Sequence, residues 1–271
     1  MIGRLLRHTA FELTGIIRRR WYLAVVAAGV LSTVAVALVA SGHDGAVRDD
    51  SFRSGSASLL LVGGLTLALS LGATAIARGG ESGHLGLLVA SGAARVEVTL
   101  ARVTARLLSL ALGCALWLAA LQVASASIGR GVDAPLATHV AAAGATHAIV
   151  LLAAAATSTV MGPAVAAIVG LIAHVTAQAV VNLEAAADLG RLGAWSRLAH
   201  VAYNILPRAV LSPMIVALQN RGEGGPAAPR FEINQILVPL PAAGIGTVLW
   251  TVFWCALLAL LCVNGMRRRT L

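Results

Sequence analysis

Six apolar stretches are the feature that most constrains this chain. A helix needs roughly 20 apolar residues to cross a bilayer, and stretches of about that length occupy 21–40, 57–77, 107–128, 140–159, 164–182 and 243–263. Only Met161, Gly162 and Pro163 separate the fourth stretch from the fifth, which is typical of a tight helix–turn–helix. We therefore expect an all-α, polytopic membrane protein in which residues 1–271 form a single transmembrane domain of six helices.

The composition supports this class and excludes several others. Of the 271 residues, 58% are hydrophobic and only 11% are charged, whereas soluble domains are about 45–50% apolar and about 25% charged. All 20 residues in the Lys+Arg count are arginine. A phosphate-binding Walker A loop and a Schiff-base site each require a lysine. The chain is therefore expected to be neither an ATPase by itself nor an enzyme of the pyridoxal type.

The charges predict an orientation. If the N-terminus is cytoplasmic, twelve arginines and three acids fall on the inside, and eight arginines and eight acids fall outside. The whole net charge of +9 then lies on one side, as the positive-inside rule requires of an N-in, C-in protein. The same placement argues against nucleic acid as a partner, because the basic residues flank apolar spans.

Two regions outside the spans, residues 1–20 and 183–242, have patterns that predict their location. Residues 1–20 mix apolar and charged side chains in an amphipathic pattern, which predicts a helix lying in the cytoplasmic interface. The alternative is a helical extension of the first span. Residues 183–242 are expected to be extracytoplasmic and to form an outer gate or a docking face. Apolar pieces there, such as 210–218, are too short to cross and are expected to be re-entrant or to lie on the membrane surface.

A polar stripe marks the fifth span. Gly170, His174, Gln178 and Asn182 recur every four residues and so share one helical face. Polar groups do not face lipid cheaply, so this face is expected to line a translocation path or a dimer seam. The alternative is hydrogen bonding between helices as packing, at about 0.6 kcal/mol per bond.

The sequence gives little support for metal binding or catalysis at the other histidines. His139 and His147 lie about 12 Å apart by helical rise, too far for one metal ion on one helix. A site that adds His174 is conceivable, but nearby acids and paired spacing are lacking. The protease motif HExxH is absent from the sequence, and its one GxSG match, at residues 80–83, lies in the charged segment between the second and third spans and not within a span. We therefore expect no catalytic residues, no metal site and no cofactor in this chain.

The segment between the second and third spans carries the most specific pattern. It places glycines, leucines and charges in an arrangement that predicts a short amphipathic helix against a cytoplasmic partner. The residues concerned are Arg78, Glu81, Gly83, Leu85, Leu87, Leu88, Arg95 and Arg102.

This pattern resembles that of the ABC type-2 exporter permeases, which runs R-x-x-E-x-G-x-L-x-L-L, then Arg, then a basic residue seven positions later. Glu12 followed by the three arginines 18–20, and the basic tail at 267–269, are similar to the family as well. The sequence departs from the family at positions 86 and 92, where glycine replaces the common Glu and Pro, and at Arg102, where the family usually has Lys.

The resemblance implies a membrane subunit without ATPase activity in a bacterial cytoplasmic membrane. Two such subunits, identical or homologous, would pair, with spans two and five as the expected seam because Gly72 and Gly170 permit close approach. Two cytoplasmic ATPase subunits, which bind ATP and Mg, would dock on the coupling segment 78–102 and drive export. Alternatives are a mechanotransmission subunit acting on an extracytoplasmic protein, and a non-transporting membrane scaffold.

Overall fold

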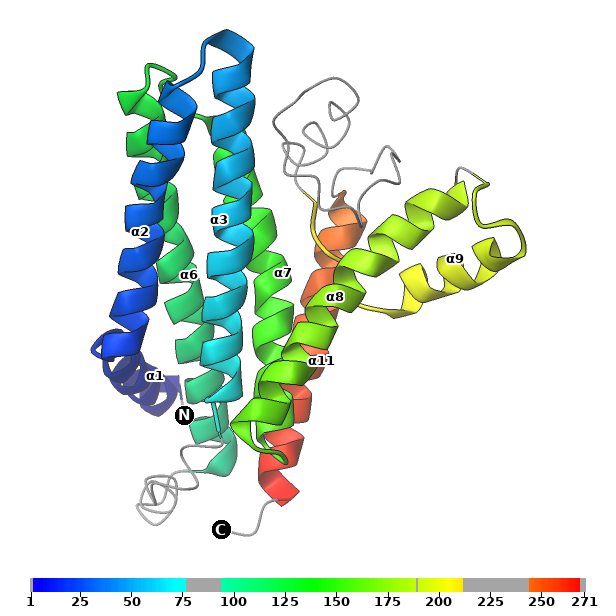
Figure 1. Ribbon diagram of the computed structural model, residues 1–271. Helices are drawn as coiled ribbons and strands as arrows, with labels where there is room; N and C mark the ends of the chain where they lie inside the picture. Colours follow the sequence, from blue (N-terminus) through cyan, green and yellow to red (C-terminus); the bar gives the residue numbers. More distant parts are fainter. Residues whose placement is uncertain (1, 77–93, 189, 212–243, 269–271) are drawn as a thin grey trace.

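The computed structural model describes residues 2–76, 94–188, 190–211 and 244–268 (Figure 1). Six long helices make up most of these ranges: α2 (Arg20–Ser41), α3 (Gly45–Ala73), α6 (Arg95–Ser127), α7 (Ala134–Ser158), α8 (Pro163–Asp188) and α11 (Ile245–Arg268). All six are long and apolar enough to cross a membrane, and no strand occurs within the described ranges. The prediction of an all-α chain with six candidate spans is confirmed, and this architecture is typical of a multi-pass membrane protein.

Several helices extend beyond the apolar stretches that predicted them. α3 begins at Gly45, twelve residues before its apolar stretch, and α6 begins at Arg95, twelve residues before its own. Residues 95–106, which the sequence analysis assigned to a connecting segment, therefore form the first turns of α6. Hydropathy detects the turns that suit lipid, whereas the polar end turns of these helices are stabilised by packing against other helices.

An additional helix precedes the bundle. α1 (Ile2–Ile17) ends just before α2 begins, and it packs mainly against α6. Ile16 is fully buried in this contact region, while Leu6 and Phe11 are exposed. The predicted helix in residues 1–20 is thus present, and its location in a membrane interface stays a prediction.

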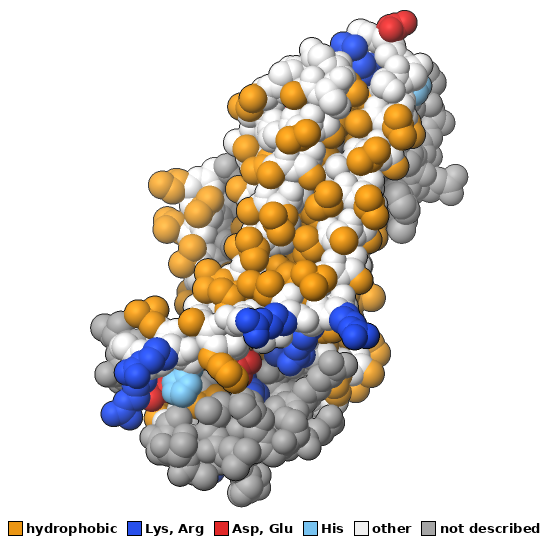
Figure 2. Space-filling model, turned by 90° about the vertical axis from the view of Figure 1, so that its left-hand side faces the viewer, with side chains coloured by type: hydrophobic (Ala, Val, Ile, Leu, Met, Phe, Trp, Pro, Cys, Tyr) orange, Lys and Arg blue, Asp and Glu red, His pale blue; other side chains and the backbone are white. Residues whose placement is uncertain are grey.

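The two ends of the chain lie at the same end of the bundle (Figure 1), as an even number of crossings requires. Figure 2 shows a broad band of hydrophobic side chains, with basic side chains along its lower edge and charged side chains again at the top. A lipid-facing belt between two charged rims has this distribution.

Small residues allow the helices to approach closely. A Cβ atom added at Gly72 of α3 would collide with the Leu151 carbonyl oxygen of α7 and lie 2.8 Å from the Ala154 Cβ. In the same way, a Cβ atom added at Gly29 of α2 would collide with the Trp117 indole of α6. Gly72 is therefore used for contact between α3 and α7 of one chain, as expected where helices pack through small residues.

A buried ion network closes the end of the bundle opposite the termini. The Asp133 carboxylate, which precedes α7, accepts hydrogen bonds from Arg53 at 3.1 Å and from Arg130 at 2.7 Å. The Gln122 side chain pairs with the Asp133 backbone in both directions at 2.9 Å. This network joins the start of α3 to the turn between α6 and α7.

Candidate intramembrane polar site

A non-helical segment enters the helix bundle. After the 3-10 turn η1 (Gly193–Trp195) and the helix α9 (Ser196–Ile205), residues 206–211 run in extended form beside α7 and α8. The Ala209 N–H donates to the Ala177 carbonyl oxygen of α8 at 3.0 Å, and the Val210 N–H donates to Thr146 Oγ1 of α7 at 2.9 Å. Both acceptors lie near the middle of their helices, so residues 206–211 enter the bundle to that depth, and we call them the re-entrant segment. The apolar piece 210–218, predicted to be re-entrant or to lie on the membrane surface, is outside the described residues from 212 onward.

Four helices hold this re-entrant segment in place. From α11, the Trp250 Nε1–H donates to the Leu206 carbonyl oxygen at 2.9 Å. The Arg208 guanidinium lies 3.9 Å from the centre of the Tyr203 ring on α9 and 5.3 Å from that of Trp250. A small apolar cluster anchors the segment on α8: Ala177, Val181, Ala185, Ala209 and Leu211. Backbone of this kind is tolerated at membrane depth only when it is buried in protein or lines a water-filled cavity.

Two histidines from different helices meet next to this segment. His147 follows Thr146 on α7, and its ring stacks on that of His174 on α8 with centroids 5.9 Å apart and planes inclined by 20°. Both side chains are buried. Among the described residues, neither Nδ1 atom has a hydrogen-bond partner. Polar side chains inside helices that can span a membrane are costly and are candidates for a functional site.

Gly64 of α3 forms the third wall of this pair. A Cβ atom at this position would lie 2.5 Å from both Cε1 and Nδ1 of His147. The imidazole therefore occupies space that any other residue at 64 would fill. The two imidazoles thus lie between α3, α7 and α8. We refer to His147, His174 and Thr146, together with residues 206–211, as the polar site.

The polar stripe predicted on α8 divides into two halves. Gly170 and His174 are buried against the chain's own helices, since a Cβ at Gly170 would lie 2.7 Å from Leu69 Cδ2 of α3 and 3.1 Å from Ala154 Cβ of α7. Gln178 and Asn182, further along the helix, are half-buried. His174 of the inner half thus belongs to the polar site, and the outer half is more accessible.

Most residues of the predicted coupling segment lie outside the described residues: Arg78, Glu81, Gly83, Leu85, Leu87 and Leu88. Arg95 is half-buried at the first position of α6. Arg102 is buried, and its Nε donates to Glu12 Oε1 of α1 at 2.9 Å, with the two side chains 6% and 14% exposed. Within this chain, Arg102 therefore neutralises Glu12 and fixes α1 to α6.

A second arginine of α6 caps a neighbouring helix. The Arg106 NH2 group donates to the Thr74 carbonyl oxygen at 3.2 Å, and its NH1 group donates to Thr74 Oγ1 at 3.4 Å. Thr74 directly follows α3, where the carbonyl groups of a helix end attract positive charge. The end of α3 is thus fixed to α6 immediately before the predicted coupling segment.

The sequence placed His174 on an inward face but did not predict its partners. Spacing along one helix shows which residues share a face, and it carries no information on which turn of another helix lies opposite. No protein-family model matches the chain, and no curated protein matches it in sequence.

Proposed function

We propose that the chain is the transmembrane permease subunit of an ABC exporter in a bacterial cytoplasmic membrane, with both termini on the cytoplasmic side. A second permease subunit pairs with it, and two cytoplasmic ATPase subunits, which bind ATP and Mg, dock on the segment 78–102. The absence of lysine from the sequence supports a division of labour in which another chain hydrolyses ATP.

The observation that carries the transport part of this proposal is the polar site at mid-depth. A scaffold needs only apolar helices that pack well, and non-helical backbone with buried imidazoles would merely destabilise it. A transporter requires such groups near the middle of the bilayer, where broken or extended segments bind cargo. The outer half of the α8 stripe, Gln178 and Asn182, then forms the route from the site to the outer surface.

The contacts at the opposite end of the bundle support the coupling part. Arg102 links α6 to α1 and Arg106 links α6 to the end of α3. A force applied to residues 78–102 would therefore displace α3, α6 and α1 together as a rigid body. We propose that closure of the ATPase pair moves this group of helices relative to α8.

Co-purification tests the proposal directly. The chain is expressed with any ATP-binding subunits that neighbouring genes encode, purified through its own affinity tag, and assayed for ATPase activity in lipid nanodiscs. Recovery of an ATP-binding subunit, with activity that falls several-fold in Glu81→Gln, is the expected result. Asp44→Asn is the matched control, because this carboxylate precedes α3 at the end opposite the termini. A chain that never recruits an ATP-binding subunit refutes the assignment.

The same preparation separates export from mechanotransmission. If ATPase coupling is present and Thr146→Val or His147→Ala leaves it and all transport-linked phenotypes unchanged, cargo does not pass through the polar site. Crosslinking of α9 to a soluble extracytoplasmic protein would then support the mechanotransmission alternative.

A further inference from the structure

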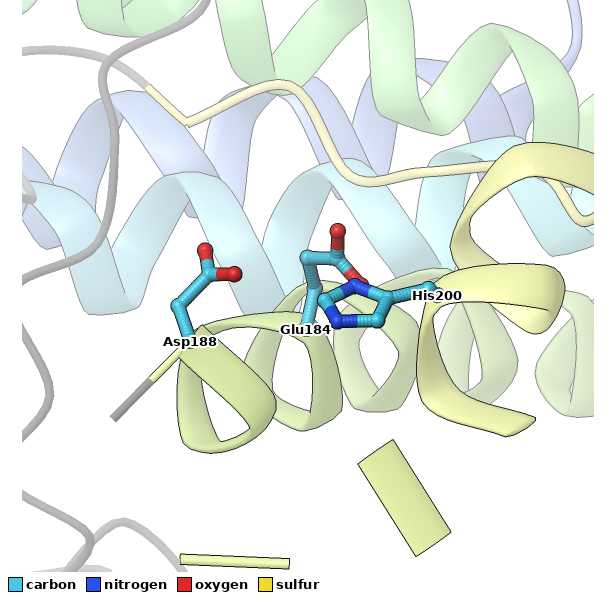
Figure 3. A group of neighbouring side chains, drawn as sticks. All are labelled: Glu184, Asp188 and His200. Atoms are coloured by element: carbon cyan, nitrogen blue, oxygen red, sulfur yellow. The ribbon is translucent and has the colours of Figure 1, made fainter. Parts of the chain in front are cut away.

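Three metal-binding side chains meet at the end of α8. Glu184 and Asp188 lie on the last turns of α8 and His200 on α9, and Figure 3 shows the imidazole ring facing the two carboxylates. One ligand atom from each residue lies within 4.8 Å of the others. We propose that Glu184, Asp188 and His200 bind a divalent transition-metal ion of the zinc type.

The fold brings these three residues together through a chain reversal. Glu184 and Asp188 are four apart and so project from one face of α8. Gly190 and Gly193 then adopt φ angles of +68° and +51°, in the left-handed region that favours glycine. The reversal lays α9 against α8, and His200 returns to a position where its Nδ1 is 2.9 Å from Glu184 Oε2.

The spacing suits a first-row transition metal. Zinc binds imidazole nitrogen and carboxylate oxygen at about 2.0–2.2 Å in a tetrahedral arrangement, so two of its ligand atoms are separated by about 3.4 Å. The three ligand atoms lie within 4.8 Å of one another, so binding requires rotation of the Asp188 or Glu184 side chain toward the other two ligands. Magnesium and calcium prefer shells of oxygen alone, whereas an imidazole favours zinc and its neighbours.

The electrostatic setting favours a cation that can enter from solvent. Glu184 is 17% exposed and His200 44% exposed, and Asp188 is exposed. The carboxylates of Glu184 and Asp188 attract positive charge, and Glu184 Oε2 already accepts a hydrogen bond from His200 Nδ1 at 2.9 Å. The C-terminal end of α8 contributes the negative pole of its helix dipole.

A bound ion would act as a clip between α8 and α9. The re-entrant segment 206–211 follows directly after α9, so an ion that fixes α9 also fixes the start of that segment. Zinc binding does not depend on the ABC assignment, since it requires only the described fold of α8 and α9. A failed ATPase assay would leave this proposal intact, and the reverse also holds.

Zinc binding to the full-length chain tests the proposal. The protein is purified with a histidine-free affinity tag, stripped with a chelator, and titrated with ZnSO₄ by isothermal calorimetry in nanodiscs. We expect one ion per chain, with affinity reduced at least tenfold in His200→Ala and in Asp188→Asn. The second variant changes one exposed side chain minimally and is not expected to disturb folding, which gel filtration checks.

His43→Ala is the matched control, because His43 is an exposed histidine that bonds only to a backbone carbonyl oxygen of its own turn. Unchanged zinc affinity in this variant supports the site. Three outcomes overturn the proposal: no saturable binding, equal affinity in wild type and His200→Ala, or a loss in His43→Ala as large as that in His200→Ala. A preference for Ca²⁺ over Zn²⁺ in the same titration contradicts the assignment to a transition metal.

Discussion

Replacing Thr146 with valine isolates the hydrogen bond that holds the re-entrant segment on α7. Thr146 is 4% exposed, and its hydroxyl donates to the Ala142 carbonyl oxygen at 3.2 Å while accepting from the Val210 N–H at 2.9 Å. Valine has nearly the same shape, so the variant removes an acceptor without opening a cavity. The Val210 N–H then has no partner, which costs about 1–3 kcal/mol.

Hydrogen exchange measures this cost locally. If amides of the segment exchange through local opening, a loss of this size accelerates exchange by about 5- to 150-fold. Mass spectrometry of a peptide covering 206–211 is the assay, with peptides from α2 as an internal reference. Thr146→Ser retains the hydroxyl, and its exchange is expected to stay near that of the wild type.

Thr157→Val is the matched control on the same helix. The Thr157 hydroxyl donates to the Ala153 carbonyl oxygen at 3.0 Å and serves no described backbone N–H as acceptor. Exchange in 206–211 should therefore be unchanged in this variant. Equal exchange in Thr146→Val and wild type, or equal acceleration in both threonine variants, would refute the reasoning about how the segment is held.

Three further predictions follow from other contacts. Glu12→Gln leaves Arg102 charged and buried, so it should destabilise the chain by about 3–5 kcal/mol. Adding Arg102→Met should recover most of the lost thermal stability. A double variant whose unfolding temperature is no higher than that of Glu12→Gln contradicts this. Gly72→Ala should lower the unfolding temperature, since overpacking costs about 1–3 kcal/mol. Gly144→Ala should raise it, because the nearest neighbouring atom lies 4.0 Å away and alanine is favoured over glycine within a helix by about 0.5–1 kcal/mol. Shifts of the same sign would be incompatible with the packing described. The hydrogen bond to Glu184 raises the pKa of His200 above its ordinary value of 6.5. The pair's contribution to folding stability is therefore fully present below pH 6.5 and is lost as the pH rises through the raised pKa. The difference in unfolding temperature between wild type and His200→Gln should shrink with increasing pH, and a difference that grows would reverse the assigned sign.

The number and type of the helices were predictable because hydropathy depends on local composition. The helix ends were not, because the first turns of α3 and α6 are polar and owe their helical form to partners such as Glu12 and Asp133. Arg102 and Arg106 of α6, seen only as charges in the sequence, are buried, and Arg53 of α3 is half-buried. The turn at 159–162 between α7 and α8 was predicted because Gly162 and Pro163 interrupt the helix by their own backbone preferences.

The candidate sites were predictable only in part. His174 was placed on an inward face because imidazoles avoid lipid, but its contact with His147 depends on how α7 and α8 align. Glu184 and Asp188 form a visible pair in the sequence, yet His200 comes twelve residues later. Its return to that pair depends on the reversal at Gly190 and Gly193, and a glycine in a sequence does not state which φ it adopts.

The two bonds made by neighbouring residues of the re-entrant segment have a consequence for the separation of α7 and α8. Ala209 bonds to α8 and Val210 bonds to α7, so these helices cannot part at mid-depth without breaking at least one bond. At about 1 kcal/mol for each, the pair would favour the closed arrangement over a parted one by roughly 30-fold. An arrangement with α7 and α8 parted at this depth would therefore be a minor state, and a partner that makes it the main state has to favour it by more than about 2 kcal/mol.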